Sequence, residues 1–235
     1  AGRKAWARLK EGIARLSVER IWAEMKKLLG AADPSRALLW MRQAGVLNLV
    51  LPETEKWGID AIHGLVAAER DLGWAPDPLL RLEAIVPPDA ARMAALAERL
   101  KLSKAEAQRL ADWAGSTLPE PDTAEAVLAR RLYAGAPAGI VDRLRLGLAG
   151  ARAAGASDDK ALRAAGGYGR LLAHARAWTK PSLPVAGADL RQLGMQPGPE
   201  LGAVLKKLEG EWITFGFLIG RDELLARAAV LAGGA

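Results

Sequence analysis

Apolar residues recur at spacings of three and four along most of the chain, and capping residues separate one such stretch from the next. This spacing places apolar side chains on one face of a helix. One example is the stretch 18–29, which Ser17 can cap, which carries Ile21 and Met25 on one side, and which Gly30 can stop. The alternation of Val, Ile and Thr that is typical of strands does not occur in the sequence. The pattern therefore predicts an all-α protein.

Other helix starts carry recognisable capping chemistry. Asp77-Pro78 places an aspartate cap before a proline at the first helical position, and Ser103 with Glu106 has the spacing of a capping box. We expect an irregular array of about a dozen helices, joined by short loops, in two packed subdomains. The clearest stretches are 3–16, 18–29, 34–44, 137–152, 158–178, 188–193, 199–217 and 222–231, with further starts near 60, 77, 89, 103 and 122. The apolar run 46–51 is predicted to be a buried turn.

Charge is distributed unevenly along the chain. The net charge is +6, but residues 1–30 carry 8 Lys and Arg against 3 acidic residues, and residues 126–181 carry 10 against 3. Between them, residues 31–125 carry 10 basic and 15 acidic residues. A basic block is either a solvated surface or a surface that binds a polyanion. These shifts, together with clusters of proline, indicate soft boundaries near residues 120 and 182.

The second basic block consists almost entirely of arginine. Arginine offers a planar fork of donors that suits phosphate oxygens, although a GC-rich genome can also enrich a sequence in arginine. Pairs spaced by seven residues lie two helical turns apart and can follow a phosphate backbone. Besides Lys160, which belongs to the same block, the candidate RNA-binding residues are Arg130, Arg131, Arg143, Arg145, Arg152, Arg163, Arg170, Arg176 and Lys180.

Several kinds of catalytic site are missing from the sequence. The chain has no cysteine, which excludes disulfides, thiolate metal sites and a cysteine nucleophile, and favours a reducing compartment. Its two histidines, His63 and His174, are far apart in sequence and are predicted to be packing or surface residues. The glycines of 166–169 have no preceding strand and no P-loop lysine, so they predict a close helix crossing. We expect no catalytic residue, metal site or cofactor in this chain.

Charged residues interrupt every apolar run before it reaches the length of a membrane span. We therefore expect no membrane contact and a cytoplasmic location. The sequence begins at Ala1, and a helical pattern is under way within three residues. This start suggests a piece of a longer protein.

Three groups of motifs, in this order, resemble one family. They are the S-x-E-R-I-x-x-E helix with the L-P-E turn, the RLA helix with the L-x-L-S helix start, and the final P-x-x-G-x-D-L, L-G and P-G-P-x-x-G segment. All of them are similar to motifs of bacterial tRNA nucleotidyltransferases, in the superfamily of CCA-adding enzymes and poly(A) polymerases. The residues that carry the resemblance are Ser17–Met25, Leu28-Leu29, Pro34, Pro52-Glu53, Asp77–Leu82, Leu100–Ser103, Pro184–Leu190, Leu193-Gly194 and Pro197–Gly202. Physically, the last motif can also be a hinge between two helices.

The resemblance implies a division into a neck remnant over 1–30, a body over 31–120 and a tail over 121–235. In the family, body and tail hold tRNA while an N-terminal catalytic head, which uses magnesium with CTP or ATP, adds nucleotides to the RNA 3′ end. The implied partners of this chain are therefore tRNA and its own head domain. The motifs that separate CCA addition from poly(A) addition would lie upstream, so both reactions remain open.

A second hypothesis comes from the eight tryptophans. Exposed tryptophans often anchor protein partners, although most tryptophans simply pack in a core. The alternative function is therefore a helical protein-interaction scaffold whose basic surfaces are only solvated.

Overall fold

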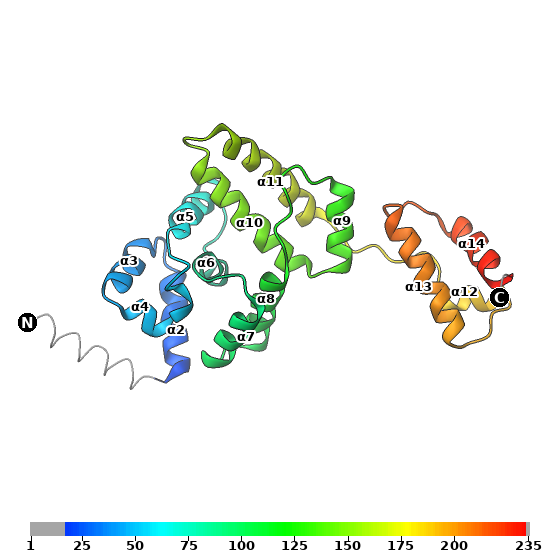
Figure 1. Ribbon diagram of the computed structural model, residues 1–235, viewed down its shortest axis with the longest axis horizontal. Coiled ribbons are helices and arrows are strands. Elements are labelled where there is room, and N and C mark those ends of the chain that lie inside the picture. Colours follow the sequence, from blue (N-terminus) through cyan, green and yellow to red (C-terminus); the bar gives the residue numbers. More distant parts are fainter. Residues whose placement is uncertain (1–16, 234–235) are drawn as a thin grey trace, which may run out of the picture. The chain divides into compact units, whose positions relative to one another are not determined.

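The computed structural model describes residues 17–233, and that part of the chain forms helices without any strand (Figure 1). The all-α prediction is confirmed, whereas the predicted helix over 3–16 lies outside the described residues. No helix in the described range is long and apolar enough to cross a membrane. The helices are α2 Val18–Leu29, α3 Ser35–Gln43, α4 Val46–Val50, the 3-10 turn η1 Pro52–Thr54, α5 Ala61–Asp71, α6 Pro78–Ile85, α7 Ala90–Arg99, α8 Lys104–Gly115, α9 Glu125–Ala134, α10 Pro137–Ala154, α11 Asp159–Ala177, α12 Gly187–Gln192, α13 Pro199–Thr214 and α14 Arg221–Gly233.

These helices form two compact units. The first, unit 1, comprises the described residues up to Thr123 together with Gly135–Arg176, and unit 2 comprises Ala124–Ala134 together with the described residues from Ala177 onward. The helix α9 therefore belongs to unit 2, although it lies between two helices of unit 1 in the sequence. The division into neck remnant, body and tail follows functional regions rather than packing, and it stays a prediction.

Capping residues begin several helices where the sequence predicts. Ser17 Oγ accepts a hydrogen bond from the backbone N–H of Arg20 at the start of α2. Asp77 Oδ1 accepts from the first two free N–H groups of α6. At the start of α8, Ser103 and Glu106 each accept a hydrogen bond from the other's backbone N–H, which completes a capping box. Local side-chain chemistry thus sets these starts.

The short run after α3 differs from the predicted turn. It forms the five-residue helix α4, which begins after Gly45 in the left-handed region, with φ 64°. Val46, Leu47 and Val50 are all buried in the core of unit 1. A single helical turn brings these three side chains to the same core, which explains why the run is helical.

Helix α6 is the central element of unit 1 (Figure 1). Every side chain from Leu79 to Ile85 is buried. Helices α2, α5, α8 and α10 all pack against it. A helix buried on all sides must bury its polar residues too, and here these are Arg81 and Glu83. The position of α6 therefore brings charged groups into the interior.

The glycine-rich stretch of α11 does contain one close backbone approach. A Cβ at Gly167 would lie 2.3 Å from the carbonyl oxygen of Pro121, whereas Gly166 and Gly169 have no atom within 4 Å of that position. The partner is the segment after α8 rather than another helix. The prediction is thus right about the close approach and wrong about what crosses there.

Unit 2 has a core of its own, built from α12, α13 and α14. Leu190, Leu208 and Leu224 are fully buried there, and Trp212 is nearly so. Tyr133 of α9 packs against this cluster, with its ring centroid 5.9 Å from that of Trp212. This contact ties α9 to the C-terminal helices.

Candidate functional site

The nine predicted RNA-binding residues fall into both units. Arg143, Arg145 and Arg152 lie on α10, and Arg163, Arg170 and Arg176 lie on α11, all in unit 1. Arg130 and Arg131 lie on α9, and Lys180 follows α11, all in unit 2. Each unit is therefore considered separately below.

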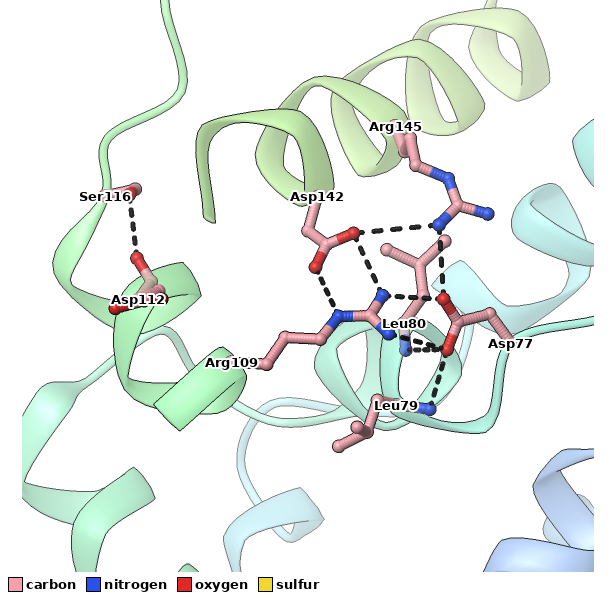
Figure 2. Close-up of polar contacts among 8 residues, drawn as sticks. All are labelled: Asp77, Leu79, Leu80, Arg109, Asp112, Ser116, Asp142 and Arg145. Atoms are coloured by element: carbon pink, nitrogen blue, oxygen red, sulfur yellow. Dashed lines mark hydrogen bonds and ion pairs between the residues drawn. The ribbon is translucent and has the colours of Figure 1, made fainter. Parts of the chain in front are cut away.

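Arg145 is engaged inside unit 1 in a network of two arginines and two aspartates (Figure 2). Its Nη1 lies 3.2 Å from Asp77 Oδ2 and 3.6 Å from Asp142 Oδ1. Arg109 completes the network, at 2.6 Å from Asp77 Oδ2 and 2.7 Å from Asp142 Oδ2. Two positive charges thus balance two negative charges, and α6, α8 and α10 are joined at one point.

Burial and the ionic partners shift the pKa values of Asp77 and Arg109 in opposite directions. Burial opposes ionisation of Asp77, but hydrogen bonds from Arg109 and the α6 backbone outweigh it and lower its pKa. Burial likewise opposes the charged form of Arg109, while the hydrogen bonds and charges of Asp142 and Asp77 raise its pKa overall. Asp77 and Arg109 are therefore both charged at neutral pH.

Glu83 lies next to this network, and its pKa is raised, whereas that of Asp77 is lowered. Burial, followed by the negative charge of Asp142, raises its pKa to about 9. Its side chain is 1% exposed, and neither carboxyl oxygen has a hydrogen-bond partner among the described residues. Glu83 is consequently a neutral carboxylic acid at physiological pH.

Arg143 binds backbone carbonyl groups at the end of α8. Its Nε donates to the carbonyl of Trp113 at 2.9 Å and its Nη2 to that of Ala114 at 3.3 Å. The guanidinium also lies over the Trp113 ring, 4.8 Å from the centroid, and burial lowers its pKa. Free carbonyls at a helix C-terminus attract a positive charge, so this arginine stabilises the contact between α10 and α8.

Trp74 brings two of the predicted arginines together. The guanidinium carbon of Arg145 lies 4.9 Å from its ring centroid, and that of Arg176 lies 5.2 Å from it. Arg176 is exposed, and burial together with the charge of Arg145 lowers its pKa. A cluster of positive charge at an aromatic ring can hold a phosphate and a stacked base. We call these three residues the Trp74 cluster.

The other predicted residues of unit 1 are exposed and make looser contacts. Arg152 Nη2 lies 3.4 Å from Asp71 Oδ2, and both side chains are about 40% exposed. Arg170 donates to the carbonyl of Thr123 at 2.9 Å, which holds the segment after α8 against α11. Arg163 is exposed on α11. Arg152, Arg163 and Arg170 therefore lie at the surface of unit 1.

In unit 2, Lys180 and Arg130 make local contacts. Lys180 Nζ lies 4.7 Å from the ring centroid of Tyr133. The hydroxyl of Tyr133 donates to Glu209 at 2.6 Å, and this hydrogen bond, followed by burial, raises its pKa to about 12. Arg130 donates to a carbonyl within α9, and Arg131 is exposed.

The aspartate of the final sequence motif has a structural role in unit 2. Asp189 Oδ2 accepts the backbone N–H of Ala186 at 2.7 Å, and its Oδ1 lies 2.6 Å from Arg221 Nη2. The hydrogen bond from Arg221, followed by that from Ala186, lowers the pKa of Asp189. These contacts fasten the start of α12 to the start of α14.

The sequence did not identify three residues of the site. Asp77 was recognised as a cap and as part of a motif that resembles the family, and neither Trp74 nor Arg109 was singled out. The available signal was the run Trp74 to Asp77 between two helices, because exposed loop residues next to a cap often carry function. The partners of this run come from α8, α10 and α11, which only the tertiary structure brings near.

Comparison with known proteins shows which proteins the chain is similar to. Residues 3–57 match the family described as "Probable RNA and SrmB- binding site of polymerase A". CCA tRNA nucleotidyltransferase 1, mitochondrial, of Mus musculus is 27% identical over 222 residues, which cover 92% of this chain and 46% of the mouse protein. The CCA-adding enzyme of Levilactobacillus brevis is 56% identical over 36 residues, 15% of this chain and 9% of that enzyme. The chain is thus similar to tRNA nucleotidyltransferases, among them CCA-adding enzymes, and its residues 3–57 match an RNA-binding region of polymerase A.

These matches support the prediction from the sequence motifs that the chain is similar to a C-terminal part of such enzymes. It spans about half of the length of the mouse relative. The matched range 3–57 covers α2, α3, α4 and η1 as well as residues outside the described range. The vertebrate relative is named as mitochondrial, and the cytoplasmic location of this chain stays a prediction.

Proposed function

We propose that this chain is the RNA-holding part of a tRNA nucleotidyltransferase, and that the RNA it holds is tRNA. The observation that carries the proposal is the Trp74 cluster, in which exposed Arg176 stands beside Arg145 with no carboxylate partner of its own among the described residues. A phosphate bound at Arg176 would supply the negative partner that this guanidinium lacks. The match of residues 3–57 to an RNA-binding family supports the same conclusion.

The physical basis of the proposed binding is electrostatic. Phosphate contacts release counterions, so affinity falls steeply as salt rises. Base edges of an RNA helix lie in a deep, narrow groove, so recognition would rest on backbone and shape. The exposed arginines of α10 and α11, together with Arg130, Arg131 and Lys180 of unit 2, would supply further contacts. Arg143 and Arg145 would act mainly by holding the surface in place.

The test measures tRNA binding by fluorescence anisotropy between about 50 and 200 mM salt. Arg176→Ala is expected to weaken binding several-fold and to reduce the salt slope by about one. Lys104→Ala is the matched control, because Lys104 is an exposed basic residue of unit 1 outside the second basic block. Binding that is absent, independent of salt, or equally reduced in both variants would contradict the proposal. An unstructured RNA of equal length tests the preference for tRNA.

The proposal assigns nucleotide addition to a catalytic head outside this chain, which would use magnesium with CTP or ATP. The partial coverage of the mouse relative supports this assignment. The chain incubated with tRNA, magnesium and labelled CTP or ATP is expected to incorporate no label. Incorporation would overturn the assignment.

A second candidate function is protein interaction, and an apolar patch on α3 and α4 favours it. Leu39, Trp40 and Leu49 are 42%, 56% and 47% exposed. The guanidinium of Arg36 lies 4.7 Å from the Trp40 ring centroid, which makes this patch amphipathic. If Trp40→Ala leaves tRNA affinity unchanged while Arg176→Ala lowers it, the patch and the RNA surface are separate.

A further inference from the structure

Residues 215–220 form the loop that joins α13 to α14 in unit 2 (Figure 1). Two large apolar side chains of this loop are exposed. Leu218 is 86% exposed, the highest value for a large apolar side chain among the described residues, and Phe215 is 56% exposed. Single apolar residues at a surface need no explanation, so the question is whether the loop holds these two in place. We call Phe215 and Leu218 the loop patch.

The backbone between the two side chains has an uncommon conformation. Gly216 and Phe217 both lie in the left-handed region, with φ of 68° and 66°, and such a φ is rare for an aromatic residue. The N–H of Phe217 donates to the carbonyl of Trp212 at 2.8 Å. The Phe217 ring also packs against the rings of Trp212 and Tyr133, with centroids 5.0 and 5.2 Å away. The core of unit 2 thus holds Phe217, while the loop patch on either side of it stays exposed.

A second set of contacts orients the exposed ring of Phe215. The guanidinium carbon of Arg227 lies 5.2 Å from the centroid of this ring. Two carboxylates hold Arg227 in turn, with its Nη1 2.8 Å from Glu211 Oε2 and its Nη2 2.6 Å from Glu223 Oε1. Because these contacts already restrict the ring, a partner that binds it loses less conformational entropy. The loop patch is therefore preorganised for contact.

The charges around the loop select the sign of the partner. Three acidic residues lie in the last turn of α13 and the first turn of α14, namely Glu211, Asp222 and Glu223. Of the two arginines nearby, Arg221 is paired with Asp189 at 2.6 Å, so Arg227 alone offsets the three carboxylates. Three negative charges and one positive charge leave a net charge of −2. Such a surface repels phosphate groups and attracts basic side chains.

We infer that the loop patch docks a basic, amphipathic segment of a partner protein. The apolar side chains of that segment would lie on Phe215 and Leu218, and its basic side chains would face Asp222 and Glu223. An amphipathic helix has this chemistry, because it presents apolar residues on one face and charged residues beside them. The inference goes beyond the proposed function and does not rest on it, since peptide binding can be measured whether or not the chain holds tRNA.

Two synthetic peptides of equal length serve as probes. The first consists of leucine and lysine, with leucines at spacings of three and four, and the second carries glutamate in place of every lysine. Binding of each peptide to the whole chain is measured by calorimetry. Wild type is expected to bind the basic peptide and not the acidic one, and its affinity for the basic peptide should fall as salt rises.

Exposed residues provide matched variants that leave the core of unit 2 intact. Phe215→Ser and Leu218→Ser each remove half of the loop patch, whereas Val230→Ser removes a 74% exposed apolar side chain near the other end of α14. The two loop variants are expected to bind the basic peptide at least about fivefold more weakly than wild type, and Val230→Ser should bind like wild type. Thermal unfolding establishes that all three variants are folded.

A second pair of variants tests the charge. Asp222 is exposed at the start of α14, and Glu200 is exposed at the start of α13, the end of that helix that lies away from the loop. Asp222→Asn is expected to weaken binding of the basic peptide about twofold, and Glu200→Gln should leave it unchanged.

Several outcomes would overturn the inference. They are no binding of the basic peptide, equal binding of the acidic peptide, equal affinities of Leu218→Ser and Val230→Ser, or equal affinities of Asp222→Asn and Glu200→Gln. A loss of tRNA affinity in Phe215→Ser with peptide binding unchanged would assign the loop to RNA and would also overturn it. Absence of tRNA binding in wild type, together with the expected peptide results, would contradict the proposed function and leave this docking site supported.

Discussion

Arg81 and Glu69 form an ion pair in the interior of unit 1, with 2.6 Å between Nη2 and Oε2 and no more than 3% of either side chain exposed. The same guanidinium donates to the carbonyls of Leu29, Ala31 and Ala32 at and beyond the end of α2. One side chain thus joins α2, α5 and α6 and satisfies backbone groups that the helix end leaves free.

Replacing Arg81 should therefore destabilise the protein strongly. Arg81→Leu would leave Glu69 as a buried charge without its partner and three carbonyls without a donor, and we expect a loss of about 3–5 kcal/mol in the free energy of unfolding. Urea denaturation followed by circular dichroism measures this loss. Arg70→Ala, at an exposed neighbour of the buried pair, should change stability by less than about 0.5 kcal/mol. Similar losses in both variants would mean that the ion pair contributes little.

Glu83 should make the protein less stable as pH rises. Its pKa is about 9 in the folded chain, against an ordinary value of 4.5, because of burial and then Asp142. Between these values the unfolded chain has lost the proton that the folded chain keeps, so stability decreases with pH by up to about 1.4 kcal/mol per unit. Glu83→Gln should flatten this dependence in unfolding experiments from pH 5 to 8. Exposed Glu98→Gln is the control, and a curve that flattens equally there would rule out Glu83 as the cause.

The capping box of α8 should make the protein more stable as pH rises, which is the opposite of the effect of Glu83. Burial raises the pKa of Glu106, but hydrogen bonds from Lys26 and Ser103 outweigh it and bring the pKa to about 2. The stabilisation is therefore present above about pH 4.5 and is lost as pH falls toward 2. Ser103→Ala is expected to cost about 1 kcal/mol at pH 7. Glu106→Gln should be less stable than wild type at pH 7 and approach it near pH 2, and a constant difference would contradict this account.

Gly139 permits the contact of α10 with α8. A Cβ at this position would lie 2.2 Å from the backbone oxygen of Asp112, which also accepts a hydrogen bond from Ser116 Oγ. Because backbone cannot move aside cheaply, Gly139→Ala should lower the free energy of unfolding by about 1–3 kcal/mol. Gly115→Ala, where no atom lies within 4 Å, should have little effect or stabilise the end of α8. Equal thermal midpoints for the two variants would show that α10 can shift without cost.

The sequence predicted much of the helix pattern because the starts depend on neighbouring residues. Ser17, Asp77 and Ser103 act within three residues of themselves, and the structure shows each of them as a cap. The buried helix α4 was missed because a run of five residues is too short for its period to be recognised. Its conformation is decided by the core that it meets.

The candidate site was less predictable, since its contacts join distant segments. The periodicity of α10 treats Arg145 and Arg152 as equivalent, two turns apart on one face. In the structure Arg145 pairs with Asp77, 68 residues away in sequence, whereas Arg152 is near the solvent-exposed Asp71. Charge and spacing describe a helix face, but only tertiary packing decides which arginines are already neutralised. Whether these residues bind RNA stays a prediction.

Unit 2 consists of two separate segments of the chain, so a single truncation cannot remove it. Because α9 lies in the chain between α8 and α10, removing everything after Arg176 would delete α12, α13 and α14 but keep Tyr133 without Trp212 and Glu209. The remaining α9 would keep a tyrosine whose ring contacts and hydroxyl acceptor are gone. A clean excision must take both segments of unit 2 and rejoin Thr123 to Gly135 with a short linker. Functions assigned to the C-terminus by simple truncation would otherwise include the damage done to this insertion.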